Sequence, residues 1–400
     1  MGVWTKIKSV LPVSSRSFHA FEAYANDCLE RIDSRQQDLA AEQANVARSL
    51  ELAQHSLNQA RQSLSTLEGS MALSEEKARL RFEVMVRDSH PNETPFETRC
   101  RIFRLYPEAE GEIRLSQLAN AAMMNALDRI CRDNGIDYWF AYGTLIATLG
   151  RSGSIPWDDD IDICMMRSDI VKLKELLSED PDWRVTLVYD RWAHCKQYRF
   201  RSTDPTIPCF IDLSVYDWAD ISTPDSDAQF KSMRLSLMDE LRLMEASLPY
   251  WSERHYLFER NSEFLLDGGE FGLGPQDSEQ TRAEIEHINQ IFDKYQKQSQ
   301  EAGILTDEQH ANAVAYAIDN IYDAPWRRTL WRRELIFPTV YHPYESYSFR
   351  VPNQARAVAD ECYPGWPYLP SDILGHNHFS KDLLHNAETQ EKLTALIHNG

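Results

Sequence analysis

The chain has 400 residues, and its 62 acidic residues outnumber its 42 basic residues, which gives a formal net charge of −20. General nucleic-acid binding depends on an excess of Lys and Arg that displaces counterions from phosphate, so this composition argues against a nucleic-acid partner. Hydrophobic residues make up 42% of the chain and charged residues 26%, which is typical of a folded protein and excludes wholesale disorder.

Cysteine usage and hydropathy suggest where the protein resides. The seven cysteines are odd in number, widely spaced and without a CxxC pair, which argues against a disulfide framework or a zinc knuckle. No run approaches the length of a transmembrane helix. Residues 1–25 combine Lys6, Lys8 and Arg16 with apolar residues but lack the features of a signal peptide. We therefore expect a cytoplasmic protein whose N-terminal segment is either a disordered terminus or a peripheral contact with the inner face of an anionic membrane.

A heptad pattern runs from Leu29 to Met71, with seam positions at alternating steps of three and four and no Pro or Gly before Gly69. This pattern is typical of a coiled coil and predicts a homo-oligomer. The weaker seam positions are Gln36, Gln43, Ala53 and Ala60. A long helix folded back on the globular body is the alternative, and the sequence does not give the number of strands in the coil.

The rest of the chain mixes helical and strand patterns, which predicts an α/β (α+β) fold with a mixed sheet flanked by helices. A linker around His90–Pro95 precedes an amphipathic helix that ends before Gly135. Later helices are expected over 145–149, 170–177, 228–260 and 278–303, and strands over 136–140, 155–165, 185–189, 197–201 and 209–215. The acidic helices between 228 and 303 are expected to present a solvated face.

The most informative stretch is the run Ile155-Pro-Trp-Asp-Asp-Asp-Ile-Asp-Ile163, which places four carboxylates within five residues. Such a run is unfavourable in a strand unless its charge is offset. Strand alternation predicts that Asp158, Asp160 and Asp162 share one face and that Asp159 lies on the other. Three carboxylates on one face form an oxygen-rich site for a hard cation such as Mg²⁺, with Mn²⁺ as a substitute.

Other interpretations of the run fit less well. A solvated acidic turn conflicts with the flanking Ile and Trp residues. A calcium loop requires Gly five residues after Asp158 and Glu eleven residues after it, whereas the chain has Ile163 and Asp169. A glycosidase pair requires two carboxylates in different environments, which a single strand does not supply.

Two further elements flank the acidic run. Gly143 and Thr144 lie at a predicted strand-to-helix junction, where backbone N–H groups can approach a phosphate. Asp212 alternates with apolar residues in a later predicted strand and is expected to be another inward-facing carboxylate, either a metal ligand or a base.

This order of elements is that of the nucleotidyltransferase superfamily, and the motifs closely resemble the LicD family, which includes fukutin and the fukutin-related protein. The resemblance rests on Tyr142-Gly-Thr-Leu145, on Arg151-Ser-Gly-Ser-Ile-Pro-Trp-Asp-Asp-Asp-Ile-Asp-Ile163 and on Ile211-Asp-Leu213. It continues more loosely to about residue 375 and leaves the predicted coiled coil outside. The loop that holds Arg151 is slightly shorter than is usual in the family, and the helices over 228–303 resemble an insertion.

The resemblance implies transfer of a phospho-alcohol (phosphocholine, glycerol phosphate or ribitol phosphate) from a CDP-activated donor to a sugar hydroxyl of a glycan or lipid-linked acceptor. The catalytic and metal-binding residues would be Asp158, Asp160, Asp162 and Asp212, and the donor-binding residues Gly143, Thr144, Arg151, Lys196 and Arg199. The predicted division is 1–25, a basic segment; 26–87, the coiled coil; 88–114, the linker; 115–220, the nucleotidyltransferase-like core; 221–305, the helical insertion; and 306–400, the C-terminal part.

Other interpretations remain open. The protein could transfer a nucleotide to a small molecule, or it could be a non-catalytic assembly factor that acts through its coiled coil. The cluster Arg327–Arg333, with its two nearby Trp residues, could face a lipid-linked acceptor or a membrane, or it could combine core packing with solvated Arg. His376-Asn-His378 alone is weak evidence for zinc.

Overall fold

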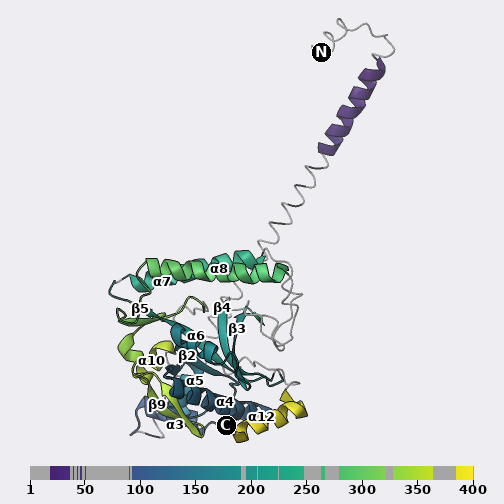
Figure 1. Cartoon of the computed structure of the whole chain (residues 1–400). Helices are drawn as coiled ribbons and strands as arrows, with labels where there is room; N and C mark the ends of the chain where they lie inside the picture. The colour runs from purple at the N-terminus through teal and green to yellow at the C-terminus, as the bar shows by residue number, and fades with distance from the viewer. Residues whose placement is uncertain are drawn as a thin grey trace. The chain divides into compact units, whose positions relative to one another are not determined.

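The computed structural model describes residues 19–36, 39, 43, 46, 50, 90, 92–190, 195–204, 206–223, 225–246, 263–265, 279–320, 328–363 and 384–399 (Figure 1). It divides into two units, residues 1–91 and residues 92–400. In the first unit, residues 19–36 and the single positions 39, 43, 46 and 50 are helical. The seam residues Leu29, Ile32, Leu39, Val46 and Leu50 are exposed. Most of the predicted coiled coil lies outside the described residues, so the coiled coil and the oligomer stay predictions.

The second unit is a mixed sheet flanked by helices, as the sequence predicts. The described strands are β1 (Tyr138–Phe140), β2 (Ile161–Met166), β3 (Trp183–Asp190), β4 (Cys195–Ser202), β5 (Phe210–Ala219), β6 (Glu263–Leu265), β7 (Ala313–Tyr316) and β8 (Leu330–Arg332), with a separate hairpin of β9 (Val340–Tyr344) and β10 (Tyr347–Val351). The described helices are α3 (Pro95–Leu105), α4 (Gly111–Asn134), α5 (Tyr142–Arg151), α6 (Arg167–Leu176), α7 (Ser226–Ala246), α8 (Glu279–Glu301), α9 (Arg333–Ile336), α10 (Ala355–Cys362) and α12 (Ala387–Asn399).

The order of the strands puts β2 and β5 side by side in the middle of the sheet. The main path is β1-β2-β5-β4-β3-β6, and β7 pairs with the later part of β5 and with β8. The β2–β5 pair is parallel, whereas the other pairs in the sheet are antiparallel. Parallel pairing brings the starts of β2 and β5 to the same end of the sheet, where Asp162 pairs with Asp212.

The strand that follows the acidic run is shorter than the sequence predicts. We expected a strand from residue 155, but β2 begins at Ile161, and Asp158–Asp160 lie in the loop that precedes it. Pro156 lacks a backbone N–H for the ladder, and consecutive Asp residues disfavour extended pairing. The face alternation that we predicted for Asp158–Asp160 therefore does not apply.

A helix occupies part of the predicted linker. Helix α3 covers Pro95–Leu105, and Thr94 caps it in a capping box in which Thr94 Oγ1 accepts a hydrogen bond from the N–H of Glu97 (3.2 Å) and the Glu97 side chain accepts one from the N–H of Thr94 (2.8 Å). The sequence carries this signal as Thr-Pro-Phe-Glu, with Pro at the first helical position.

The predicted insertion is an integral part of the second unit. Helices α7 and α8 lie side by side (Figure 1). They bury Phe230, Leu237, Leu241, Ile288 and Phe292 in a cluster with residues of β3, β5 and β7. Arg234 of α7 is buried and donates hydrogen bonds to the carbonyl oxygens of Tyr316 (2.7 Å) and Ala317 (2.6 Å). The expected solvated face is therefore only the outer side of this helix pair.

Candidate active site

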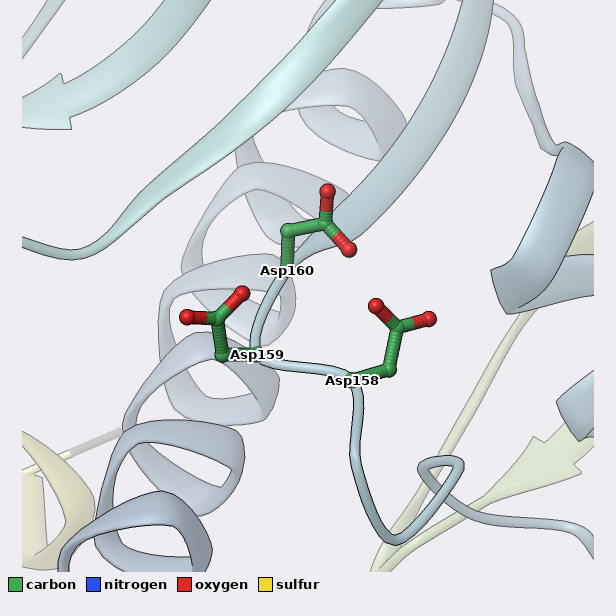
Figure 2. Close-up of side chains that lie close together, drawn as sticks. All are labelled: Asp158, Asp159 and Asp160. Carbon is green, nitrogen blue, oxygen red and sulfur yellow. The ribbon is translucent and has the colours of Figure 1, made fainter. Parts of the chain in front are cut away.

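The carboxylates of the acidic run and of β5 converge in two groups. Asp158, Asp159 and Asp160 form one group, and Asp160, Asp162 and Asp212 form the other. Within each group, one carboxylate oxygen per residue lies within 4.8 Å of the others. Figure 2 shows the first group, whose members follow one another along the loop before β2. Asp160 belongs to both groups and therefore links two neighbouring sets of oxygen ligands.

The parallel register of β2 and β5 builds the second group. Asp162 and Asp212 are register partners, so their side chains leave the sheet on the same face. Arg199 of β4 is the register partner of Asp212 on the other side, and its Nε donates a 2.7 Å hydrogen bond to Asp212 Oδ1. The Arg199 guanidinium lies 4.1 Å from the ring centre of Phe210. Both members of this ion pair are buried, so the orientation of Asp212 is well defined.

The start of α5 supports both carboxylate groups. A Cβ atom on Gly143 would lie 2.9 Å from Asp158 Oδ2, closer than Cβ atoms approach, so a side chain at this position would displace the Asp158 carboxylate. The Asp158 carboxylate thereby reaches the N-terminal end of a helix, where the dipole favours negative charge. Thr144 Oγ1 accepts a 2.9 Å hydrogen bond from the N–H of Asp162. Gly143 therefore leaves room for the Asp158 carboxylate and Thr144 binds the backbone of Asp162, and the contact of both residues with a donor phosphate stays a prediction.

The clustered negative charge is unfavourable by itself. Burial raises the pKa of Asp158 well above its ordinary value, and the neighbouring carboxylates of Asp160, Asp162 and Asp159 raise it further. A proton or a cation must offset this charge. The donor set consists of carboxylate oxygens, which are the ligands that Mg²⁺ and Mn²⁺ prefer. The residues present thus fit a divalent cation, and Asp159, which we expected on the opposite face, lies within one of the two groups.

Glu345, which the sequence did not indicate, fastens the loop before the acidic run. It lies at the turn between β9 and β10 with a φ of 51°. Its carboxylate accepts hydrogen bonds from the N–H of Ser154 (2.8 Å) and from both terminal nitrogens of Arg114 (2.9 and 2.7 Å). Its own N–H donates to the carbonyl oxygen of Ser152 (2.8 Å). Because Glu345 is so distant in sequence from Ser154, local patterns could not reveal this contact.

Two predicted donor-binding residues make other contacts. Arg151 donates to the carbonyl oxygens of Phe103 (3.4 Å) and Tyr106 (3.3 Å), which ties the end of α5 to α3. Lys196 is three residues before Arg199 on β4, so its side chain lies on the opposite face of the sheet. There its Nζ is 3.9 Å from Asp319 and 5.2 Å from the ring centre of Phe292 of α8. The structure thus separates Lys196 from the carboxylate groups, which corrects its expected position.

Other predicted features lie away from the carboxylates or outside the described residues. Arg328 lies before β8, Arg332 is the last residue of β8 and Arg333 is the first residue of α9. They pair with Glu361, Glu334 and Glu308, respectively. Arg327 and the segment His376–His378 lie outside the described residues. None of the described helices is long and apolar enough to cross a membrane.

Comparison with known proteins links this geometry to a family. Residues 135–260 match the family model described as LicD/FKTN/FKRP, nucleotidyltransferase domain. The resemblance to the LicD family is confirmed. The matched range contains Gly143, Thr144, the whole acidic run and Asp212, and it excludes the N-terminal unit.

Curated relatives match shorter stretches. An uncharacterized protein of Rickettsia prowazekii is 33% identical over 76 residues, which cover 19% of this chain and 29% of the relative. The lipopolysaccharide cholinephosphotransferase LicD of Haemophilus influenzae is 26% identical over 117 residues, which cover 26% of this chain and 44% of the relative. The chain thus spans less than half the length of these relatives.

Proposed function

We propose that the protein is a metal-dependent phosphotransferase that moves a phospho-alcohol from a CDP-activated donor to a sugar hydroxyl of a cell-surface glycan or its lipid-linked precursor. The observation that carries the proposal is the pair of carboxylate groups that share Asp160, within the domain that resembles the LicD family. The similarity to a lipopolysaccharide cholinephosphotransferase supports a phospho-alcohol as cargo.

The roles of the residues follow from their placement. Asp158, Asp160, Asp162 and Asp212 would hold Mg²⁺ or Mn²⁺, and Asp159 completes the first group. When bound, the cation offsets negative charge on the donor phosphates. Arg199 uses one oxygen of Asp212 and leaves the other for a ligand, so we assign Asp212 to cation binding rather than to proton removal.

The reaction is an in-line displacement at phosphorus. The acceptor hydroxyl oxygen forms a bond to the phosphorus that carries the alcohol, and the bond from this phosphorus to the oxygen of the CMP phosphate breaks. CMP leaves with the bonding electron pair, and the hydroxyl proton passes to a base or to water. The carboxylate groups at the starts of β2 and β5 would hold the cation and, through it, the donor phosphates, so that attack and departure are aligned.

The test is CMP release. The full-length protein is incubated with CDP-choline, CDP-glycerol or CDP-ribitol and candidate glycan acceptors, with Mg²⁺ or with EDTA. We expect CMP from one donor, dependent on acceptor and Mg²⁺. Release of pyrophosphate from a nucleoside triphosphate would instead favour nucleotide transfer to a small molecule. If calorimetry detects no Mg²⁺-dependent binding of any cytidine nucleotide, the assembly-factor alternative is favoured.

A further inference from the structure

Two buried amides of α4 hold the loop that carries the acidic run. The Nε2 of Gln117 donates hydrogen bonds to the carbonyl oxygens of Ile155 (2.8 Å) and Asp158 (2.7 Å). The Nδ2 of Asn120 donates to the carbonyl oxygen of Asp159 (2.7 Å). Gln117 and Asn120 are three residues apart and therefore lie on the same face of the helix. Three carbonyl groups of one loop are thus bound by two side chains.

These amides are unusual for their surroundings. They are 3% and 1% exposed, in a stretch of α4 that otherwise buries Ala119, Met123 and Met124. An apolar residue would serve the packing of a buried helix face equally well, and a buried amide that lacks partners is costly. The hydrogen bonds to the loop therefore explain why amides, rather than apolar side chains, occupy these two buried positions.

Gln117 also belongs to a chain of contacts around the loop. Its Oε1 accepts a 3.4 Å hydrogen bond from Arg114, and Arg114 binds Glu345, which holds the N–H of Ser154. The loop is therefore fastened at its start by Glu345 and at its acidic end by Gln117 and Asn120. This orientation of the Gln117 amide satisfies both its donor and its acceptor groups.

Asn120 has one further group that points to a ligand. Its Oδ1 is buried and has no hydrogen-bond partner among the described residues. A buried amide oxygen of this kind favours a donor such as a water molecule. The Nδ2 of the same amide binds the backbone carbonyl of Asp159, so the amide that carries this oxygen contacts the loop of the first carboxylate group.

We propose that Gln117 and Asn120 are positioning residues of the cation site, which hold the backbone of residues 155–159 so that Asp158, Asp159 and Asp160 converge. Asn120 Oδ1 would additionally accept a hydrogen bond from a water molecule beside this loop. This proposal rests on the proposed function, because it assumes that the carboxylate groups bind a divalent cation. Groups that orient metal ligands typically contribute 10–100-fold to metal affinity.

The test measures Mn²⁺ affinity of the full-length protein by calorimetry, beside its thermal stability in EDTA. The variants are Gln117→Met, which keeps the size and removes the amide; Gln117→Asn, which keeps an amide too short to span both carbonyls; and Asn120→Leu. The matched control is Asn134→Leu, because Asn134 of the same helix donates to the carbonyl oxygen of Ile130 (2.9 Å), away from the loop. We expect about tenfold weaker Mn²⁺ binding for the first three variants and unchanged binding for the control.

The outcomes separate the two proposals. If the parent protein binds no divalent cation, the proposed function fails. If the parent binds Mn²⁺ and the folded Gln117→Asn and Asn120→Leu variants bind it with the same affinity, the positioning role is wrong. A purely structural role would lower the melting temperature in EDTA without weakening Mn²⁺ binding. Gln117→Asn is the mildest change and keeps the test decisive if Gln117→Met does not fold.

Discussion

Two clusters of acidic residues each include one residue of β5, and they differ in how the pKa of their carboxylates is shifted. Asp212, near the start of β5, belongs to the carboxylate groups of the candidate active site. Asp217, five residues later, forms two hydrogen bonds with Arg167 (2.7 and 2.8 Å), and Arg167 also pairs with Asp319, which lies near Lys196. In the second cluster, two carboxylates thus face two basic groups.

The pKa values of the carboxylates in the two clusters are shifted in opposite directions. Burial would raise the pKa of Asp319, but the charges of Arg167 and Lys196 and hydrogen bonding outweigh it and lower the pKa to about 2. Burial and neighbouring carboxylates together raise the pKa of Asp158. The surroundings of Asp319 therefore favour its ionised carboxylate, whereas the surroundings of Asp158 favour its protonated form. These opposite pKa shifts distinguish the Asp217–Asp319 cluster from the acidic run.

The largest expected effect concerns the carboxylate that links both groups. Asp160→Asn should lower the rate of CMP release by roughly 10³-fold, because it removes a ligand from each oxygen set at once. Its unfolding midpoint in EDTA should not fall, since a crowded negative charge is lost. Asp217→Asn is the contrasting variant, with lower stability but parental activity per folded molecule. Equal activity of Asp160→Asn and the parent would show that the carboxylate groups are not the active site.

The second largest effect is on the free energy of unfolding when the Asp217–Asp319 cluster is changed. Asp319→Asn should reduce the free energy of unfolding by roughly 3 kcal/mol at pH 7, because it removes the buried carboxylate that pairs with Arg167 and Lys196 and leaves Asp217 as the only carboxylate facing them among the described residues. Urea unfolding followed by circular dichroism measures the loss. A loss below about 0.5 kcal/mol would indicate that water, not Asp319, solvates these basic groups.

The sequence predicted the carboxylates of the site better than the residues that hold them. Asp158, Asp160, Asp162 and Asp212 follow from a local motif and from alternation with apolar residues. Asp159 was misplaced because strand alternation was extended into a loop. Lys196 was grouped with Arg199 by proximity in sequence, although an odd separation along a strand puts the two side chains on opposite faces.

The supporting residues carry no comparable local signal. Gln117 lies in an amphipathic helix whose periodicity says which face is buried, not which loop that face binds. Glu345 is remote in sequence from the loop that it fastens and becomes part of the site only through the packing of the β9–β10 hairpin. Mixed α/β architecture follows from element patterns, but the β2–β5 pairing that joins Asp162 to Asp212 depends on tertiary structure.

The third effect is the pH dependence of the stability that Asp319 contributes to the Asp217–Asp319 cluster. Asp319 has a native pKa of about 2 against an ordinary value of 3.8, so its contribution is fully present above about pH 4 and is lost as the pH falls through 2. The difference corresponds to roughly 2 kcal/mol. The gap in unfolding free energy between the parent and Asp319→Asn should therefore narrow by this amount between pH 5 and pH 2. A constant gap over this range would contradict the ion pairing.

The smallest expected effect is on the thermal stability of the Asp158→Asn variant. Whether this variant is more or less stable than the parent should depend on whether a divalent cation is bound. Asp158 has a raised native pKa, so its ionisation destabilises the folded state increasingly as the pH rises from its ordinary value of 3.8 towards the native one. In EDTA at pH 8, Asp158→Asn should therefore have a higher melting temperature than the parent, and the gain should vanish near pH 4. With saturating Mg²⁺ the order should reverse, because the parent gains binding energy that the variant lacks. An Asp158→Asn protein that is less stable than the parent in EDTA at pH 8 would mean that the charge of Asp158 is already offset within the chain, and the two clusters would then differ in position but not in kind.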